Sequence, residues 1–205
     1  MSAASAGGPP RTLLLATHNA HKLREFERLL RADGRGSLEL VALPREVSMP
    51  PEVGETFAEN ALGKARAAAR ACGRVSVADD SGIAAEALGG APGVRSARYA
   101  GEHASDEQNL RKLLDEAPAG SALEYVCVIA YVDPLEGSER TFEGRCRGRL
   151  AAEPRGRRGF GYDPAFEPDD GPADTTMAQL ADSEKDAISH RGRAARALLD
   201  WLSGG

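Results

Sequence analysis

The fold class follows from one stretch near the start of the chain, Thr12-Leu13-Leu14-Leu15-Ala16-Thr17-His18-Asn19-Ala20-His21-Lys22. Its first half is a short apolar run that suits a buried strand, and its second half is a polar turn. After the turn, Leu23, Phe26 and Leu30 recur at helical spacing, with Arg and Glu between them. We therefore predict a strand that leads through the turn into a helix, which begins near Asn19 or Ala20.

Strand and helix patterns then alternate along the chain. Leu38–Leu43 predicts a second strand, and Val75–Ala78 predicts a short third strand that ends at Asp79-Asp80. Between these strands, Thr56 and Glu59 form a capping-box pattern ahead of a face rich in alanine. This pattern predicts a helix that starts at Thr56.

The second half of the chain predicts a strand pair and two more helices. Ser105 or Asp106 can cap a helix, and a last helix follows Ser189. Leu123–Val132 and Arg140–Leu150 are strand patterns joined by a turn, which indicates a hairpin.

This order of elements predicts an α/β fold, with a long twisted mixed sheet flanked by helices and two lobes with a central active-site cleft. The chain length suits one compact unit. We expect residues 1–10 to be a disordered tail and residues 11–205 to form a single domain.

The composition is that of an ordinary globular protein, since 41% of the residues are hydrophobic and 28% are charged. The longest apolar run, Val126–Val132, is much shorter than the roughly 18 residues that cross a bilayer, so we expect no membrane span. Residues 1–10 lack the basic and apolar regions of a secretory signal. The cysteines, Cys72, Cys127 and Cys146, are odd in number and widely spaced. We therefore expect reduced thiols and a cytoplasmic location.

The net charge argues against a nucleic-acid polymer as partner. The formal charge is −5, and binding to a long polyanion depends on the neutralisation of many phosphates. The basic stretch Arg145–Arg158 can still form a local positive patch. A small polyanion such as a nucleotide is therefore compatible with the sequence.

The turn Thr17–Lys22 is the first candidate site. A strand that ends in this turn and opens a helix presents backbone N–H groups, a helix dipole, small polar side chains and the Lys22 ammonium to one point. Such an arrangement suits a phosphate. The alternative is a plain helix cap with a solvated Lys22, because the turn has none of the glycines of a P-loop.

Asp79-Asp80 and the loop carboxylate Glu52 form the second candidate. Acids at this density repel one another unless a cation lies among them, and their oxygens suit Mg²⁺ that also holds substrate phosphates. A carboxylate left free beside the metal can take a proton from water. The alternative is that Asp80 caps the following turn and that Glu52 is merely exposed.

Two later segments can bind a planar ring. In Gly159–Pro164, glycines flank two aromatic residues, so that backbone amides and a ring can approach a ligand closely. Lys185, His190 and Arg191 gather hydrogen-bond donors around a helix start, where they could meet a carbonyl-bearing base or a phosphate. The alternatives are an aromatic turn that closes the core and an ordinary capping histidine.

In this order, these segments resemble the family of inosine and xanthosine triphosphate pyrophosphatases of the Ham1-like type, which act on non-standard purine nucleoside triphosphates. The resemblance extends from Leu13 to about Leu202. It rests on the blocks Thr17–Lys22, Gly54–Ala61, Ala78–Gly82, Leu88–Gly93 with Ser96–Tyr99, Gly159–Pro164, and Glu184–Arg191.

The resemblance implies the reaction and its cofactor. ITP, dITP or XTP would be cleaved between the α- and β-phosphates with Mg²⁺, giving a nucleoside monophosphate and pyrophosphate. A homodimer with the active site in a cleft between the lobes is also implied. Two positions depart from expectation: His18 stands where glycine is more frequent, and Glu52 is assigned only by its place before Gly54.

The resemblance also implies a role for each candidate residue. Asp80 would activate the attacking water, and Glu52 and Asp80 would bind Mg²⁺. Donors at the purine would favour a 6-keto group over the 6-amino group of adenine. The substrate would be bound at the phosphates by Thr17, His18, Asn19, Ala20, His21 and Lys22, by Ser81, at the base and sugar by Phe160, Gly161, Tyr162 and Asp163, and at the purine by Lys185, His190 and Arg191.

Three other functions stay open at this point. A Maf-like nucleotide pyrophosphatase has a similar overall shape, although the motifs Phe160–Asp163 and Ser189–Arg191 speak against it. A catalytically silent nucleotide sensor would gain nothing from acids clustered beside a polyanion unless a metal is held there. A nucleic-acid-binding module on Arg145–Arg158 would need interleaved aromatic residues, which this stretch lacks.

Overall fold

In the computed structural model, which describes residues 12–31 and 38–204, six strands form one sheet in the order β2-β1-β3-β4-β5-β6. The strands are β1 (Thr12–Leu15), β2 (Glu39–Ala42), β3 (Ser76–Ala85), β4 (Ala122–Asp133), β5 (Ser138–Leu150) and β6 (Phe166–Pro168). The helices are α1 (Ala20–Arg31), α2 (Phe57–Cys72), α3 (Asp106–Glu116), α4 (Asp182–Ile188) and α5 (His190–Gly204). Short 3₁₀ turns lie at η1 (Glu86–Leu88), η2 (Gly93–Arg98), η3 (Asp163–Ala165) and η4 (Met177–Gln179). The predicted tail, residues 1–10, lies outside the described residues.

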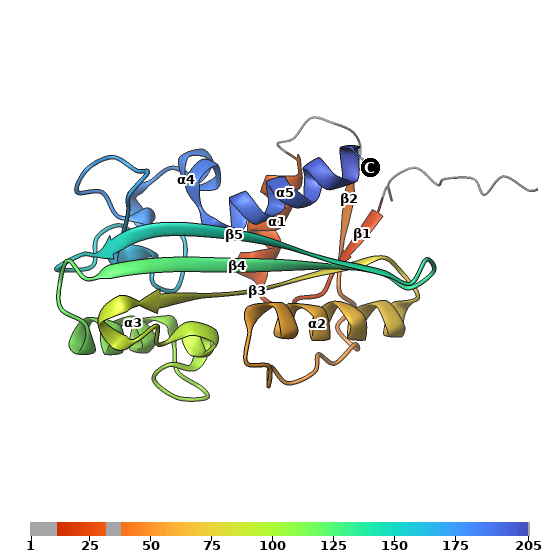
Figure 1. The fold of residues 1–205 in the computed structure, drawn as a ribbon, viewed down its shortest axis with the longest axis horizontal. Coiled ribbons are helices and arrows are strands. Elements are labelled where there is room, and N and C mark those ends of the chain that lie inside the picture. The colour runs from red at the N-terminus through yellow and green to blue at the C-terminus, as the bar shows by residue number, and fades with distance from the viewer. Residues whose placement is uncertain (1–11, 32–37, 205) are drawn as a thin grey trace, which may run out of the picture.

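The sheet is mixed, as the sequence predicted. β1 pairs in parallel with β2 and β3, whereas β3, β4, β5 and β6 pair antiparallel. The three long strands β3, β4 and β5 run along the molecule, with β1 and β2 beside one end (Figure 1). The predicted hairpin is confirmed, because β4 and β5 pair along their full length.

Helices cover both faces of the long strands, which explains why β4 is apolar at nearly every position. Val128 and Ala130 pack in the cluster under α2, whereas Ile129 and Tyr131 pack in the cluster under α1 and α5. A third cluster joins α3 and β6 to the end of the sheet that lies away from β1 and β2 (Figure 1). The protein therefore has two clusters on opposite faces at the end of the sheet with β1 and one cluster at the other end, and the long strands connect the two ends.

β3 is longer than the sequence predicted. The expectation that this strand ends before Asp79 was wrong, because every residue from Ser76 to Ala85 pairs with β4. The long neighbouring strand supplies backbone partners throughout, and this pairing overrides the turn-forming composition of residues 79–82. Since successive side chains of a strand point to opposite faces, Asp79 and Asp80 face different layers of the protein.

The edge of β3 is open over a short length, and this opening places the site. β1 pairs with β3 only at Ser76 and Val77, and farther along the edge a single bridge joins Ala84 to Pro92. Between these points the edge of β3 faces the turn after β1. Ligands of open parallel sheets bind in this position, beyond the carboxyl end of a strand.

The structure also bears on the cysteines and on membrane spans. Cys72, Cys127 and Cys146 are free thiols, and the last two are buried among apolar residues. None of the helices in the described ranges is long and apolar enough to cross a membrane.

Candidate functional site

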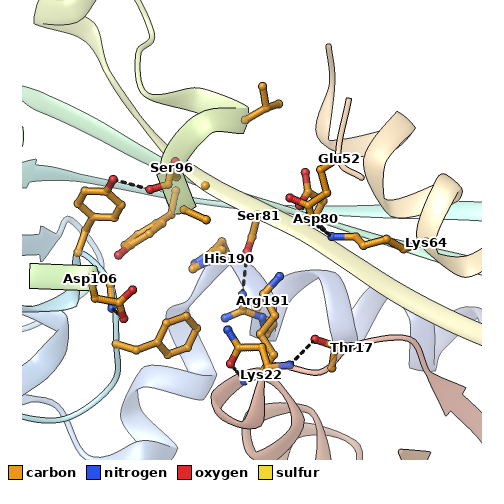
Figure 2. A pocket seen from close by; sticks show the side chains of 18 of the residues that line it. Thr17, Lys22, Glu52, Lys64, Asp80, Ser81, Ser96, Asp106, His190 and Arg191 are labelled. Carbon is orange, nitrogen blue, oxygen red and sulfur yellow. Dashed lines mark hydrogen bonds and ion pairs between the residues drawn. The ribbon is translucent and has the colours of Figure 1, made fainter. Parts of the chain in front are cut away.

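A cavity of about 400 Å³ lies along the open edge of β3. Its volume is in the range of ordinary small-molecule sites. Residues of the turn after β1 and of α2 line one end, and residues of η2, α3 and the segment before η3 line the other. Figure 2 shows Glu52, Lys64 and Asp80 on one side of His190 and Asp106 on the other.

The cavity brings together nearly all the residues that the sequence singled out. Those that line it are Thr17, His18, Asn19, Lys22, Glu52, Asp80, Ser81, Phe160, Gly161, Tyr162, Asp163, Lys185, His190 and Arg191. Ala20 and His21 lie just outside its lining. The His21 ring still approaches the site, since its centre is 5.4 Å from that of Phe160.

The turn Thr17–Lys22 is held by its own side chains. Thr17 Oγ1 accepts from the Asn19 N–H at 3.1 Å, and Asn19 Oδ1 accepts from the N–H groups of His21 and Lys22 at 2.8 and 3.2 Å. Asn19 thus caps α1 and uses two of the N–H groups that the sequence argument offered to a phosphate. In the described part of the chain, the N–H groups of His18 and Ala20 have no protein acceptor, so these two are available to an anion.

The His18 and Lys22 side chains leave this turn in different directions. The His18 ring nitrogen Nε2 lies 3.0 Å from the Val47 carbonyl and so contacts the loop after β2. Lys22 Nζ lies 3.0 Å from Asp79 Oδ2, which keeps its ammonium at the cavity wall. Asp79 is buried, and the charges of Lys22 and Arg191 outweigh burial and hold the pKa of its carboxyl well below the ordinary value.

Two carboxylates converge on one cation at this end of the cavity. Lys64 Nζ, from α2, donates to Glu52 Oε1 at 2.5 Å and to Asp80 Oδ1 at 3.1 Å. Burial raises the pKa of Asp80 above its ordinary value; Lys64 opposes this rise, and Glu52 adds to it. Burial would also raise the pKa of Glu52, but Lys64 reverses the effect and the pKa is lowered. Two acids in such different environments are suited to different tasks.

The donor set at this point fits a magnesium ion that is bound with its substrate. No group of three or more His, Cys, Asp or Glu side chains gathers in a metal-binding arrangement within residues 12–31 and 38–204. Glu52 and Asp80 nevertheless both contact the Lys64 ammonium, and both offer carboxylate oxygens. Mg²⁺ often takes one or two protein carboxylates and completes its shell with phosphate oxygens and water. The site therefore fits a metal that arrives with a polyphosphate.

At the other end, Phe160 offers a half-buried ring face. Lys185 Nζ and Arg191 Cζ lie 5.3 and 5.5 Å from the centre of this ring. Gly159 makes the turn possible, because it has a φ of +72° and a Cβ there would lie 2.0 Å from Asp163 Oδ2. Tyr162 also lines the cavity, but it is held from the opposite side. Its hydroxyl donates to the Ser96 carbonyl at 2.7 Å, and its ring is buried.

A buried network fixes the two cations beside Phe160. Lys185 Nζ donates to Glu25 Oε1 and Asp163 Oδ2 at 2.6 and 2.7 Å. Arg191 donates to Glu25 and Asp79 and, at 2.8 Å, to Ser81 Oγ. Burial alone would lower the pKa of Lys185, but Asp163 and Glu25 raise it above the ordinary value. Both side chains therefore stay charged and keep one orientation.

His190 is buried and neutral. Its ring stacks on Tyr125, with centres 4.4 Å apart and planes 3° from parallel, and its Nδ1 is buried without a hydrogen-bond partner. Burial, together with the charges of Arg191 and Lys185, places the pKa of His190 well below the ordinary value. Because no acceptor lies within reach of Nδ1 in the described ranges, we assign Nδ1 as the unprotonated nitrogen. The proton then sits on Nε2, and the histidine is a neutral donor.

Several residues of the site were missed by sequence reasoning. Lys64 and Asn60 stand on the alanine-rich face of α2, where two polar side chains among buried alanines are a signal in themselves. Glu25 lies one helical turn after Lys22 on α1, which places both on one face. Asp106 accepts from the Gly161 N–H at 2.9 Å and so fixes the turn that carries Phe160.

Comparisons with known proteins give one answer. The model of the Ham1 family matches residues 13–201. The dITP/XTP pyrophosphatase of Frankia alni is 50% identical over 201 residues, which is 93% of this chain and 96% of the relative, and that of Cutibacterium acnes is 46% identical over 91% and 94%. A Ham1 protein of Coxiella burnetii superimposes with a TM-score of 0.82 at 39% identity, covering 95% of this chain and 99% of that chain. The nucleoside-triphosphatase, or dITP/XTP pyrophosphatase, of Mycobacterium abscessus superimposes with a TM-score of 0.70 at 44% identity, covering 92% and 98%.

Proposed function

Since the chain belongs to the Ham1 family, we propose that its cavity hydrolyses purine nucleoside triphosphates of the inosine and xanthosine type. The enzyme is a hydrolase of nucleotide metabolism that converts ITP, dITP or XTP to the nucleoside monophosphate and pyrophosphate. One observation supports this most strongly. A single cavity has two carboxylates that share a cation at one end and an aromatic ring with rigid hydrogen-bond donors at the other.

Asp80 is the general base of the proposed reaction. Lys64 donates to its Oδ1 and Asn60 donates to its Oδ2, each at 3.1 Å, so the carboxylate is held in one orientation. Each oxygen keeps a lone pair that can accept a proton from water. Burial raises the pKa of the Asp80 carboxyl above its ordinary value, which makes the carboxylate a stronger base than that of an exposed aspartate.

Glu52 and Asp80 would hold the Mg²⁺ ion, and the turn Thr17–Lys22 would hold the phosphates. A bound Mg²⁺ supplies charge neutralisation at the phosphates and at the attacking water. The N–H groups of His18 and Ala20, at the positive end of α1, favour a phosphate oxygen. Lys22 and Lys64 add positive charge on two sides of the phosphate path. These groups together stabilise the charge that develops in the transition state.

Selection for a 6-keto purine follows from how few donors the base end leaves free. Lys185 has three N–H donors and uses two, and Arg191 has five and uses four. The remaining N–H groups and the Nε2–H of the neutral His190 are donors, and the unprotonated Nδ1 of His190 is buried. A 6-keto oxygen can accept from such a group, whereas a 6-amino group would place donor against donor. The base itself would stack on Phe160.

Two further parts of the proposal concern the whole molecule. The family resemblance supports a homodimer. The free thiols of Cys127 and Cys146, which are buried, support a cytoplasmic location. Light scattering in solution tests the dimer, and its mass must be twice that of one chain.

The experiment that tests the function measures pyrophosphate release with Mg²⁺ from dITP, ITP, XTP, dATP, dGTP and UTP, for the protein and for Asp80→Asn. We expect release from the first three, little from dATP, whose 6-amino group would place donor against donor, and near-complete loss in the variant. If the folded protein releases no pyrophosphate from any of the six, the enzyme proposal is wrong and a nucleotide sensor is the better account. Equal release from UTP would favour the Maf-like alternative.

A further inference from the structure

The segment Gly54–Asn60 joins the loop that carries Glu52 to the helix that faces Asp80. Its start is rigid, because Thr56 and Glu59 form a complete capping box at the beginning of α2. Glu59 Oε2 also accepts from the Glu55 N–H at 2.8 Å. Asn60 lies in the first turn of this well-fixed helix, so its side chain has a defined place relative to the loop.

Asn60 hydrogen-bonds in two directions. Its Oδ1 accepts from the Gly54 N–H at 2.8 Å, and its Nδ2 donates to Asp80 Oδ2 at 3.1 Å. The residue is only 4% exposed and therefore has little access to solvent partners. A neutral amide can bridge the loop and the carboxylate in this way without neutralising Asp80, which a cation in the same place would do.

Gly54 is shaped to accept this contact. A Cβ at this position would lie 2.7 Å from Asn60 Oδ1 and 2.8 Å from Glu59 Cβ, both too close for a side chain. The glycine therefore lets the loop backbone approach the helix. On its other side, the loop is tied by Arg98, whose Nη2 donates to the Glu52 carbonyl at 3.0 Å.

We propose that Asn60 is a positioning residue, which fixes the separation of Glu52 and Asp80 so that both carboxylates reach one divalent cation. The inference rests on the proposed function, which supplies the cation. Lys64 follows Asn60 by one helical turn on the same face of α2, and its contacts with both carboxylates show that the two already converge on one point. Asn60 fixes the separation of the two carboxylates, and the Lys64 ammonium lies at the point where they converge.

The experiment measures Mn²⁺ binding by electron paramagnetic resonance, with the protein saturated by the α,β-methylene analogue of dITP, which cannot be cleaved at that bond. Asn60→Ala removes both hydrogen bonds, and Asn60→Leu removes them while keeping the side-chain shape. We expect the Mn²⁺ dissociation constant to rise about tenfold in both variants, as is usual when a partner of a metal ligand is lost. Glu52→Gln gives the reference for the loss of a ligand.

Thr56→Ala is the matched control, because it weakens the same helix start without touching Asp80. It should lower the melting temperature about as much as Asn60→Ala and leave the Mn²⁺ dissociation constant within about twofold of the parent value. The inference is overturned if the Asn60 variants bind Mn²⁺ as the parent does or if Thr56→Ala weakens binding equally. It is also overturned if the parent protein holds no more Mn²⁺ than the analogue alone. Pyrophosphate release from dITP by the parent protein tests the proposed function separately, so the two failures are distinguishable.

Discussion

At the proposed phosphate end of the cavity Glu52 and Lys22 are partly exposed, although Lys64 and Asp80 are buried, whereas at the proposed base end every charged group of the network is buried. The Glu52 side chain is 31% exposed, and Lys64 holds it together with Asp80. At the base end, Lys185 and Arg191 are 6% and 2% exposed and are held by three acids. The same residue types thus occur in two different states of solvation.

The difference follows from what each end must do. Charges that meet a polyphosphate and a metal have to exchange partners when the substrate arrives, and a partly solvated cluster can do so at low cost. Donors that read a base have to stay in place, and a buried, fully paired network is rigid. With the proposed function, the chemistry lies at the open end and the recognition of the base lies at the closed end.

The largest expected effect separates the two acids of the open end. Asp80→Asn should lower kcat about 10³-fold, because a general base contributes roughly 10² to 10⁴. Glu52→Gln should weaken metal binding, so that added Mg²⁺ restores much of its rate. Steady-state pyrophosphate release from dITP over a wide Mg²⁺ range measures both. Recovery of Asp80→Asn at high Mg²⁺ would show that Asp80 acts only as a ligand.

The next effect compares the stability of the two ends. Arg191→Met removes a buried cation from both Asp79 and Glu25, so we expect the free energy of unfolding to fall by about 3–5 kcal/mol. Lys64→Met should cost less, about 1–3 kcal/mol, since Glu52 can turn to solvent and the buried Asp80 keeps the hydrogen bond from Asn60. Urea unfolding at neutral pH measures both values. Equal losses would contradict the distinction between an open and a closed end.

Much of this architecture could be predicted from the sequence, and the exceptions have a common cause. Local signals such as the Thr56–Glu59 capping box gave the start of α2 correctly. The length of β3 could not be predicted, because pairing with β4 overrides the turn-like residues 79–82. α4 and β6 were also missed, since both are short and have no periodic pattern of their own.

The site residues divide in the same way. The motif Gly159–Pro164 could be predicted to form a turn, but only the fold shows that Phe160 is half-buried at the cavity while Tyr162 is buried and donates to the Ser96 carbonyl. Glu25 and Lys64 were missed because a charged residue on a helix is usually assigned to its solvated face. Their function depends on partners that are far away in sequence, which no local pattern contains.

A smaller effect tests the turn that carries Phe160. Gly159→Ala should destabilise the protein by about 3 kcal/mol, since its positive φ is strained for alanine and its Cβ would lie 2.0 Å from Asp163 Oδ2. Gly161 has a φ of +63°, but a Cβ there would meet open space. Gly161→Ala should therefore cost about 1 kcal/mol from backbone strain alone. Thermal unfolding of the pair measures the difference. Similar melting temperatures would show that the Asp163 contact does not shape this turn.

The smallest effect concerns pH. The pKa of His190 is well below 6.5 in the folded protein, whereas the unfolded chain takes up this proton near pH 6.5. Below pH 6.5 the unfolded state therefore binds more protons than the folded state. The free energy of unfolding is unaffected by His190 above pH 6.5 and falls below it by at most about 1.4 kcal/mol per pH unit. His190→Phe should flatten this part of the stability profile. His103→Gln, at an exposed position, is the control and should keep the slope.

The division between the two ends is tested most directly by the ratio of kcat/KM for dITP to that for dATP. His190→Phe keeps a flat ring against Tyr125 and removes only the ring nitrogens of a neutral residue. We predict that Asp80→Asn slows both substrates alike and leaves the ratio unchanged, whereas His190→Phe lowers the ratio about tenfold, as the loss of one buried hydrogen bond requires. A ratio that changes in Asp80→Asn, or that survives in His190→Phe, would contradict the account.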